Sequence, residues 1–371
     1  MTTIDTADTA TIDTAAAVEQ LAGRLFTSSV GALELFNVQL GVTLGLYREV
    51  VAAGPVTSAQ LAAATGCDER YVREWCLGQA TAGLLTADGQ DPATARYAGT
   101  PGLAEVLLDE LSPAYLAPLG AALAAVGTVF PALVEAFRTG DGVPYAAYGL
   151  GAVSAQAALN RPAYTHQLVA EWLPAVPDVA ARLADAQRPP AVADLGCGAG
   201  WASIELAKAF GHLKVDGYDA DEASIMQART GALAAGVADR VHFEVCDLSS
   251  TDEDKPRYEI ALMFECLHDM ADPDGVLATT RAQMAPGGTL LIMEERADEA
   301  MATTEDPVQR FFAACSPLWC LPQGRIGTGA HPVGTMIRPA KVVALAEGAG
   351  FREVADIGIE HPFWRFFRAT A

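Results

Sequence analysis

Glycines and an acid follow one apolar segment in a spacing suited to holding a small cofactor. The segment Val192–Leu195 contains Asp194 and leads into Gly196-Cys197-Gly198-Ala199-Gly200. Glycines let a backbone turn sharply and approach a ligand closely, because they carry no Cβ. A dinucleotide fingerprint would need a further glycine or alanine where Trp201 or Ser203 stands, depending on which glycine starts the count. The spacing therefore disfavours a nicotinamide or flavin dinucleotide.

Two further acids end the next two predicted strands. Asp219 closes the apolar segment that starts at Val215, and Asp247 follows Val241–Val245. A carboxylate at Asp219 can accept hydrogen bonds from both hydroxyls of a ribose, and such bonds contribute about 1.5–3 kcal/mol each. Asp247 stands where an adenine amino group could donate. Because open α/β sheets bind ligands at the carboxyl ends of their strands, this series of acids and glycines indicates S-adenosylmethionine (SAM).

Strands and helices must alternate to bring these residues to one edge. Apolar strand-like segments are separated by helical ones from Pro190 onward, which predicts a parallel sheet with right-handed crossovers. The predicted strands are 191–195, 215–218, 241–245, 260–264 and 289–293, and the predicted helices are 202–210, 223–235 and 273–284. The segment 353–369 is typical of two strands joined near His361-Pro362.

The first hundred residues predict a helical unit with a two-stranded wing. Thr57 and Gln60 fit a capping box, Asp68 can cap a second helix, and Gly83 ends that helix before short strands at 84–86 and 96–98.

Charge disfavours DNA binding by this winged helix. Its second helix offers only Arg70 and Arg73 against three acids, and the chain carries a net charge of −22. Nucleic-acid affinity depends largely on Lys and Arg neutralising phosphates. We therefore expect a scaffold or dimerisation role, no nucleic-acid partner, and a small acceptor that is uncharged, cationic or weakly polar.

The sheet region resembles the class I SAM-dependent methyltransferase family, from about Pro190 to Ala371. The resemblance rests on the loop, the acids and Ala285-Pro286-Gly287-Gly288-Thr289 before the fifth strand. It implies a Rossmann-like seven-stranded sheet with a terminal antiparallel hairpin, SAM as the cofactor, and Leu248 and Phe264 as further cofactor contacts.

The preceding helical and winged-helix region resembles the dimerisation part of small-molecule O-methyltransferases, so we expect a homodimer. A closer likeness is to an actinobacterial group of winged-helix methyltransferases. It rests on Asn160-Arg161-Pro162, Leu267-His268-Asp269, Pro332-Val333-Gly334-Thr335-Met336 and His361-Pro362-Phe363.

We expect His268 to act as a general base in methyl transfer. It follows the fourth strand, histidine titrates near neutral pH, and a base accelerates transfer to a hydroxyl by about 10²–10⁴-fold. In the O-methyltransferases the catalytic histidine has a similar Leu-His-Asp setting, and Glu294 matches an orienting carboxylate. The second orienting acid of that pattern falls on Met336 here. The alternative is a structural histidine that packs or bonds to the backbone.

The acceptor side is less defined by the sequence. The segment 296–335 interrupts the fold after the fifth strand, and such insertions often form lids. The candidate substrate contacts are Tyr164, Phe312, Trp319, His331 and Arg338. Core packing or surface structure would also explain the presence of each of them.

We divide the chain into a disordered tail (1–15), a winged-helix dimerisation domain (16–100), a helical linker and substrate region (101–187) and a catalytic domain (188–371) with the lid at 296–335. Seven scattered cysteines and six dispersed histidines predict no metal site. The start lacks a secretory signal, and we expect no membrane span and a cytoplasmic location.

The sequence thus predicts SAM-dependent methyl transfer to an oxygen atom of a small, largely apolar or aromatic molecule. Three alternatives stay open: a C- or N-methyltransferase, a SAM-binding winged-helix transcriptional regulator, and an enzyme that uses SAM in a non-methylating reaction.

Overall fold

The computed structural model describes residues 14–249, 258–301 and 304–371. The chain divides into two compact units, Met1–Leu108 and Asp109–Ala371. The predicted tail lies almost wholly outside the described residues, and its last two positions, Thr14 and Ala15, already belong to the first helix. The helical segment after Leu108 belongs to the same unit as the large sheet.

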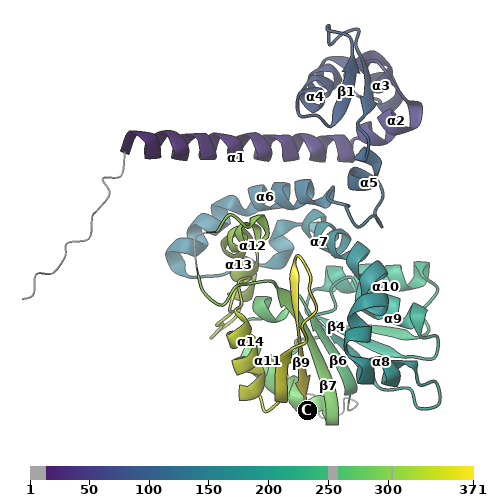
Figure 1. Cartoon of the computed structure of the whole chain (residues 1–371), viewed down its shortest axis with the longest axis vertical. Coiled ribbons are helices and arrows are strands. Elements are labelled where there is room, and N and C mark those ends of the chain that lie inside the picture. The colour runs from purple at the N-terminus through teal and green to yellow at the C-terminus, as the bar shows by residue number, and fades with distance from the viewer. Residues whose placement is uncertain (1–13, 250–257, 302–303) are drawn as a thin grey trace, which may run out of the picture. The chain divides into compact units, whose positions relative to one another are not determined.

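The first unit is the predicted winged helix (Figure 1). The capping box of Thr57 and Gln60 is present, and the Asp68 carboxylate accepts the backbone N–H groups of Arg70 and Tyr71. Its elements are α1 (Thr14–Thr43), α2 (Leu46–Ala53), α3 (Ser58–Thr65), α4 (Glu69–Thr81), the antiparallel strands β1 (Leu85–Asp88) and β2 (Arg96–Gly99), and α5 (Leu103–Leu107).

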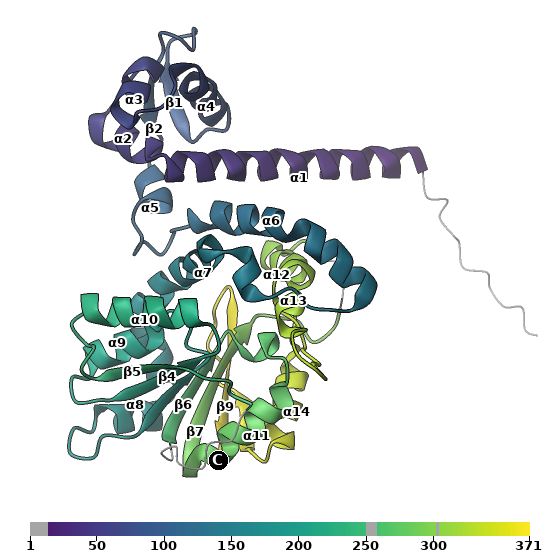
Figure 2. The same cartoon turned by 180° about the vertical axis from the view of Figure 1, so that it is seen from behind.

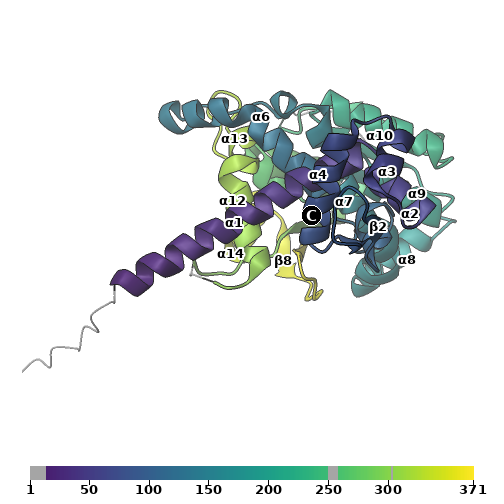
Figure 3. The same cartoon turned by 90° about the horizontal axis from the view of Figure 1, so that it is seen from above.

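Only the C-terminal end of α1 packs closely against the rest of its unit. A Cβ on Gly41 would lie 2.5 Å from the Trp75 ring of α4, and the Trp75 indole N–H donates to Asn37 O at 2.9 Å. Figure 3 shows α1 as one continuous helix running away from α4. Along it, exposed apolar side chains recur at three- and four-residue intervals, at Val18, Leu21, Leu25, Phe26, Val30, Leu33, Phe36 and Leu40.

Two helices are long and apolar enough to cross a membrane by length and composition alone: α1 and α6 (Pro118–Thr139). This criterion does not test the expectation that the chain has no membrane span, which stays a prediction. The core helices of soluble proteins also pass it, and α6 buries Ala125, Val129 and Leu133 in its own unit.

The second unit is the predicted seven-stranded sheet (Figure 2). Its strands run in the order β5-β4-β3-β6-β7-β9-β8, and only β9 is antiparallel to its neighbours. The strands are β3 (Val192–Leu195), β4 (Val215–Asp219), β5 (Val241–Val245), β6 (Tyr258–Phe264), β7 (Met284–Glu295), β8 (Arg352–Asp356) and β9 (Trp364–Thr370).

Helices before and between these strands complete the second unit. After α6 come the short helix η1 (Tyr145–Tyr148), α7 (Leu150–Ala163), the π-helix η2 (Tyr164–Trp172), η3 (Leu173–Ala175), α8 (Pro177–Ala184), α9 (Trp201–Ala209), α10 (Glu222–Ala234), η4 (Leu267–Asp269), α11 (Pro273–Gln283), α12 (Pro307–Leu318), α13 (Cys320–Gly324) and α14 (Pro339–Gly348). The predicted lid contains α12 and α13.

Alternate side chains of the strands build two cores, one on each face of the sheet. In β6, Ile260, Leu262 and Phe264 pack with η2, α8, α9 and α10, whereas Ala261 and Met263 pack with α11 and α14. A sheet covered on both faces holds its strand ends in fixed positions, and those ends carry the predicted site.

The π-helix η2 joins the helical segment to the first core. Pro162, near the end of α7, has no N–H to donate four residues back, and the chain continues from Tyr164 in the wider π form. Side chains four residues apart on it, Tyr164, Leu168 and Trp172, are all buried.

We predict that Leu168→Ala destabilises the second unit by about 2–5 kcal/mol, because it deletes a side chain that is 0% exposed and leaves a cavity. The free energy of unfolding from urea titration measures the effect. Leu150→Ala, at a leucine that is 69% exposed, is the matched control and should change it by less than about 0.5 kcal/mol. Equal losses in the two variants would contradict the packing described for η2.

Candidate active site

The loop between β3 and α9 adopts a conformation that requires its glycines. Gly196, Gly198 and Gly200 have φ angles of 68°, 51° and 73°. A Cβ on Gly196 would lie 2.7 Å from Cys266 Sγ, and one on Gly200 would lie 2.3 Å from the Phe243 ring. The loop is thus pressed against the Phe243 ring of β5 and against Cys266 just after β6, and its backbone can approach a ligand closely.

Asp194 holds this loop to the helix that follows it. Its Oδ2 accepts hydrogen bonds from Ser203 N at 3.2 Å and Ser203 Oγ at 2.6 Å, and the residue is buried. Burial raises the pKa of the Asp194 carboxyl to about 6, and the Ser203 hydrogen bonds oppose that rise. Asp194 was predicted as a cofactor contact, and the contacts described within the chain are those of a residue that shapes the loop.

Asp219 ends β4 directly beside the same loop. Its Oδ2 accepts the Gly198 N–H at 2.8 Å, and its Oδ1 accepts the Asp221 N–H at 2.9 Å. Burial raises the pKa of this carboxyl, and the two backbone hydrogen bonds lower it. A carboxylate oxygen can accept more than one hydrogen bond, so both oxygens keep capacity for ribose hydroxyls.

The remaining predicted cofactor residues lie at the next strand ends. Asp247 is exposed after β5, where its Oδ1 accepts from Ser249 N and Ser249 Oγ at 2.9 and 2.7 Å. Leu248 packs against the core on one face of the sheet, and Phe264 belongs to the core on the other face. Their contact with a cofactor stays a prediction.

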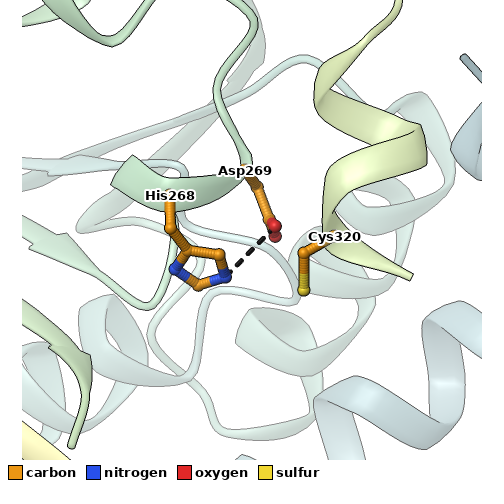
Figure 4. Close-up of side chains that lie close together, drawn as sticks. All are labelled: His268, Asp269 and Cys320. Atoms are coloured by element: carbon orange, nitrogen blue, oxygen red, sulfur yellow. Dashed lines mark ion pairs between the residues drawn. The ribbon is translucent and has the colours of Figure 1, made fainter. Parts of the chain in front are cut away.

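His268 lies in η4, just after β6, and is surrounded by carboxylates. Its Nδ1 is 2.5 Å from Glu294 Oε2 and 3.0 Å from Glu295 Oε2 at the end of β7. Its Nε2 is 3.1 Å from Asp269 Oδ1 on the other side of the ring (Figure 4). Glu294 also accepts the Leu267 N–H at 3.0 Å. His268 and Glu294 are each 1% exposed.

The surrounding acids decide the charge of this imidazole. Burial lowers the pKa of His268, but Asp269, Glu295 and Glu294 together raise it well above its usual value. Burial raises the pKa of Glu294 to about 7, while the His268 imidazolium lowers it. The group therefore holds a proton at neutral pH, shared between the ring and its carboxylates.

Cys320 of α13 also faces this group, since its Sγ, His268 and Asp269 offer atoms within 4.8 Å of one another (Figure 4). Burial raises the pKa of the Cys320 thiol far above its usual value. The prediction that no metal binds to the chain is not tested by this arrangement and stays a prediction.

Sequence reasoning missed Glu265, which follows β6 with a φ of 53°. Its carboxylate accepts hydrogen bonds from the Asn160 side-chain amide and the Trp364 indole N–H. Burial and then the Glu295 charge raise the pKa of Glu265 to about 8. The sequence offered a partial signal, because the motifs around Asn160 and His361 both approach this residue in the fold.

Tyr145 was also missed as an individual site residue. Burial raises the pKa of its hydroxyl, and the charges of Asp219 at the end of β4, Asp221 just after it and Asp269 after β6 raise it further. Its hydroxyl is thus within electrostatic range of acids at the ends of two strands of the sheet.

The predicted acceptor contacts fall into two groups: three aromatic residues that pack within the second unit, and two basic residues with partners at its surface. Tyr164 stacks on Phe264, with ring centroids 6.3 Å apart, and burial followed by the Glu265 charge raises the pKa of its hydroxyl. Phe312 is buried in α12, and Trp319 packs on Tyr148 at 4.9 Å.

His331 and Arg338 have partners on the protein surface. The His331 ring is exposed, 3.2 Å from Asp274 Oδ2, and the Arg338 guanidinium donates to Asp298 O at 2.6 Å. The structure brings neither into the group around His268, and a substrate contact by either stays a prediction.

Comparisons with known proteins agree with this geometry. Residues 193–290 match a family model described as a methyltransferase domain, and residues 31–107 match a Rv2258c-like winged HTH domain. The ubiquinone biosynthesis O-methyltransferase of Sinorhizobium fredii is 28% identical over 166 residues, 45% of this chain and 61% of that protein. The chain thus spans less than two thirds of that relative's length.

Solved structures share the fold across both units. Human N-acetylserotonin methyltransferase in complex with SAM matches with a TM-score of 0.67 and 18% identity, covering 94% of this chain and 97% of that one. An O-methyltransferase family protein from Burkholderia thailandensis matches with a TM-score of 0.66 and 18% identity, covering 96% and 97%.

The chain therefore carries a methyltransferase domain preceded by a winged HTH domain, and it shares its fold with a methyltransferase solved in complex with SAM. Its own residues fit that cofactor. The three left-handed glycines form a surface that a Cβ would obstruct, and the half-buried Asp219 carboxylate stands beside them with hydrogen-bonding capacity left.

We predict that Asp219→Asn weakens binding of S-adenosylhomocysteine about 10- to 100-fold. The amide carries no charge, so it loses charge-assisted hydrogen bonds worth about 1.5–3 kcal/mol. It also has one oxygen instead of two, so it cannot accept the Gly198 and Asp221 N–H groups through separate oxygens. Calorimetric titration measures the affinity. Asp239→Asn, at a highly exposed acid, is the control and should leave it unchanged. Wild-type affinity in Asp219→Asn would exclude the assigned ribose contact.

Proposed function

We propose that the protein transfers a methyl group from SAM to a hydroxyl oxygen of a small, largely apolar or aromatic molecule, with His268 as the general base. The observation that carries this proposal is the buried His268–Glu294 pair at the sheet edge that holds the cofactor loop. Cys266 links the two parts, because its Sγ lies against the loop and donates to Leu195 O at 3.2 Å.

When bound, SAM supplies a methyl group on a sulfonium, which an in-line nucleophile can displace. The chain's own residues then have to position the hydroxyl and take its proton. The His268 Nδ1–H donates to Glu294, which fixes the tautomer and leaves Nε2 as the nitrogen that receives the proton. Asp269 Oδ1 is 3.1 Å from Nε2, but this oxygen accepts no hydrogen bond of suitable geometry. An acceptor hydroxyl can therefore replace Asp269 at Nε2.

The same charges predict how the reaction depends on pH. A base must be neutral to accept a proton, and the surrounding carboxylates raise the pKa of His268 well above 6.5. The rate should therefore rise with pH and reach half its maximum above pH 6.5.

We also propose a homodimer formed through the first unit. Support comes from the exposed apolar row on α1, because monomeric proteins rarely leave extended apolar surfaces in water. It also comes from the winged-helix domain, which resembles the dimerisation part of small-molecule O-methyltransferases. A cytoplasmic location and the absence of nucleic-acid and membrane partners stay predictions from the sequence.

We predict that His268→Gln lowers kcat about 10²–10⁴-fold, because it keeps a polar side chain and removes the base. Glu294→Gln should lower kcat as well and move the pH–rate profile to lower pH, since one raising charge on His268 is gone. Turnover is measured as S-adenosylhomocysteine release with an acceptor found in a panel of phenols. Unchanged binding of S-adenosylhomocysteine is the control for folding. An unchanged rate in His268→Gln would favour C- or N-methylation without this base.

We predict that the double substitution Leu25→Glu and Phe26→Glu gives a monomer, because it places charges in the apolar row of α1. Light scattering after size-exclusion chromatography measures the mass. Leu233→Glu, at an exposed leucine of α10, is the control and should leave a dimer. A wild-type monomer would contradict the proposed homodimer.

A further inference from the structure

The acceptor side of the sheet edge holds more acids than cations, at buried and half-buried positions. Glu265, Glu294, Glu295 and Asp269 lie around the single imidazole of His268. In the described parts of the chain, no Lys or Arg forms an ion pair with any of these four acids. One imidazolium cannot balance them, and burying uncompensated carboxylates is costly.

Glu265 is held in place at a conformational cost. A φ of 53° is unusual for a residue other than glycine and costs about 1–3 kcal/mol. Contacts from three elements maintain it: Asn160 of α7 and Trp364 of β9 donate to its carboxylate, and its own N–H donates to Met293 O of β7 at 2.7 Å. Its side chain is half-buried, so the fixed carboxylate remains accessible to a small ligand.

Glu295 supplies the second carboxylate and lacks a donor. The residue is 6% exposed, and its Oε2 has no hydrogen-bond partner although His268 Nδ1 is 3.0 Å away. The single proton on Nδ1 points to Glu294, which leaves the neighbouring oxygen of Glu295 without one. A buried carboxylate oxygen in this state is a binding position for a donor that the chain itself does not provide.

Glu265 and Glu295 lie close enough to act on each other. The Glu295 charge is, after burial, the main reason that the pKa of Glu265 is raised, and the Glu265 charge acts in turn on the Tyr164 hydroxyl. Trp364 joins the two acids, because its indole N–H donates to Glu265 and its backbone is paired with Glu295 between β7 and β9. Glu265 also directly follows Phe264, whose ring is stacked with that of Tyr164. A cation between the acids would have carboxylates and aromatic rings as neighbours.

We propose that Glu265 and Glu295 form a subsite for a protonated nitrogen of the methyl acceptor, so that the acceptor is an aromatic molecule carrying a basic amine. This inference rests on the proposed function, because it assigns the acceptor class of the same site. An ammonium group can donate to the free Glu295 oxygen and to the remaining lone pairs of Glu265. A metal ion fits Glu265 less well, because both oxygens of its carboxylate already accept protein N–H groups.

Matched phenols test the subsite with the full chain saturated with S-adenosylhomocysteine. Tyramine, 4-ethylphenol and 3-(4-hydroxyphenyl)propanoate share a phenol and differ in the charge of the side arm. Ligand-observed NMR titration to millimolar concentration gives their affinities. We expect tyramine to bind at least tenfold more tightly than 4-ethylphenol, and the propanoate to bind more weakly than both.

Variants then assign the preference to these residues. Glu265→Gln and Glu295→Gln keep the shape and remove the charge, and each should reduce the preference for tyramine at least fivefold. Glu353→Gln is the matched control, because Glu353 also has a positive φ, of 52°, but is exposed on β8. It should keep the wild-type preference.

The proposal is overturned if tyramine fails to bind at millimolar concentration, if it binds no better than 4-ethylphenol, or if both variants keep the wild-type preference. It is also overturned if the preference requires added Zn²⁺ or Mg²⁺, since the acids then hold a metal. Failure of the proposed function is separate: S-adenosylhomocysteine and tyramine would bind as expected while no phenol or amine in the panel accepts a methyl group.

Discussion

The close packing of the glycine loop against a side chain of β5 and the segment just after β6 is the constraint on which the site depends. Gly200 leaves no room for a Cβ beside the Phe243 ring, and Gly196 leaves none beside Cys266. Because Cys266 lies between Glu265 and His268 in sequence, the position of the loop also fixes the start of the acceptor side. The cofactor loop and the proposed base are thus parts of one packed unit, so we expect a change at one to affect the other.

The carboxylates around His268 have opposing effects. They orient the ring and stabilise the imidazolium that forms when a proton is taken up. They also raise its pKa, so that the free protein holds the ring protonated at neutral pH. A bound cation would reduce this effect, because its charge opposes that of the carboxylates. Acceptor binding and the readiness of the base would then be linked through the same few charges.

The sequence predicted the parts of this site that follow from local order. The glycine loop, Asp219 and the strand pattern are each defined within a few residues, and the regular alternation of strands and helices brings their ends to one edge. Glu265 was missed because its environment depends on Asn160 and Trp364, which are 105 and 99 residues away. For Asp194 the sequence predicted the position of the residue but not the partner of its side chain. Only the structure shows that its carboxylate accepts hydrogen bonds from Ser203.

The helical segment before the sheet contains the other residues whose role at the site the sequence did not predict. Its Ala-rich pattern gave no reason to separate Tyr145 from ordinary core residues, because burial alone does not distinguish a packed aromatic from one over a site. Asn160 was recognised only as part of a family motif, without a partner for its side chain. The segment 109–187 packs in the same unit as the sheet, so these residues are contributed to the edge from outside the region that binds the cofactor. The predicted cofactor contacts lie on the short loops of the sheet, whereas the acceptor subsite that we propose depends on long-range contacts made by α7 and β9. The first can therefore be read from a motif, and the second only from the folded chain.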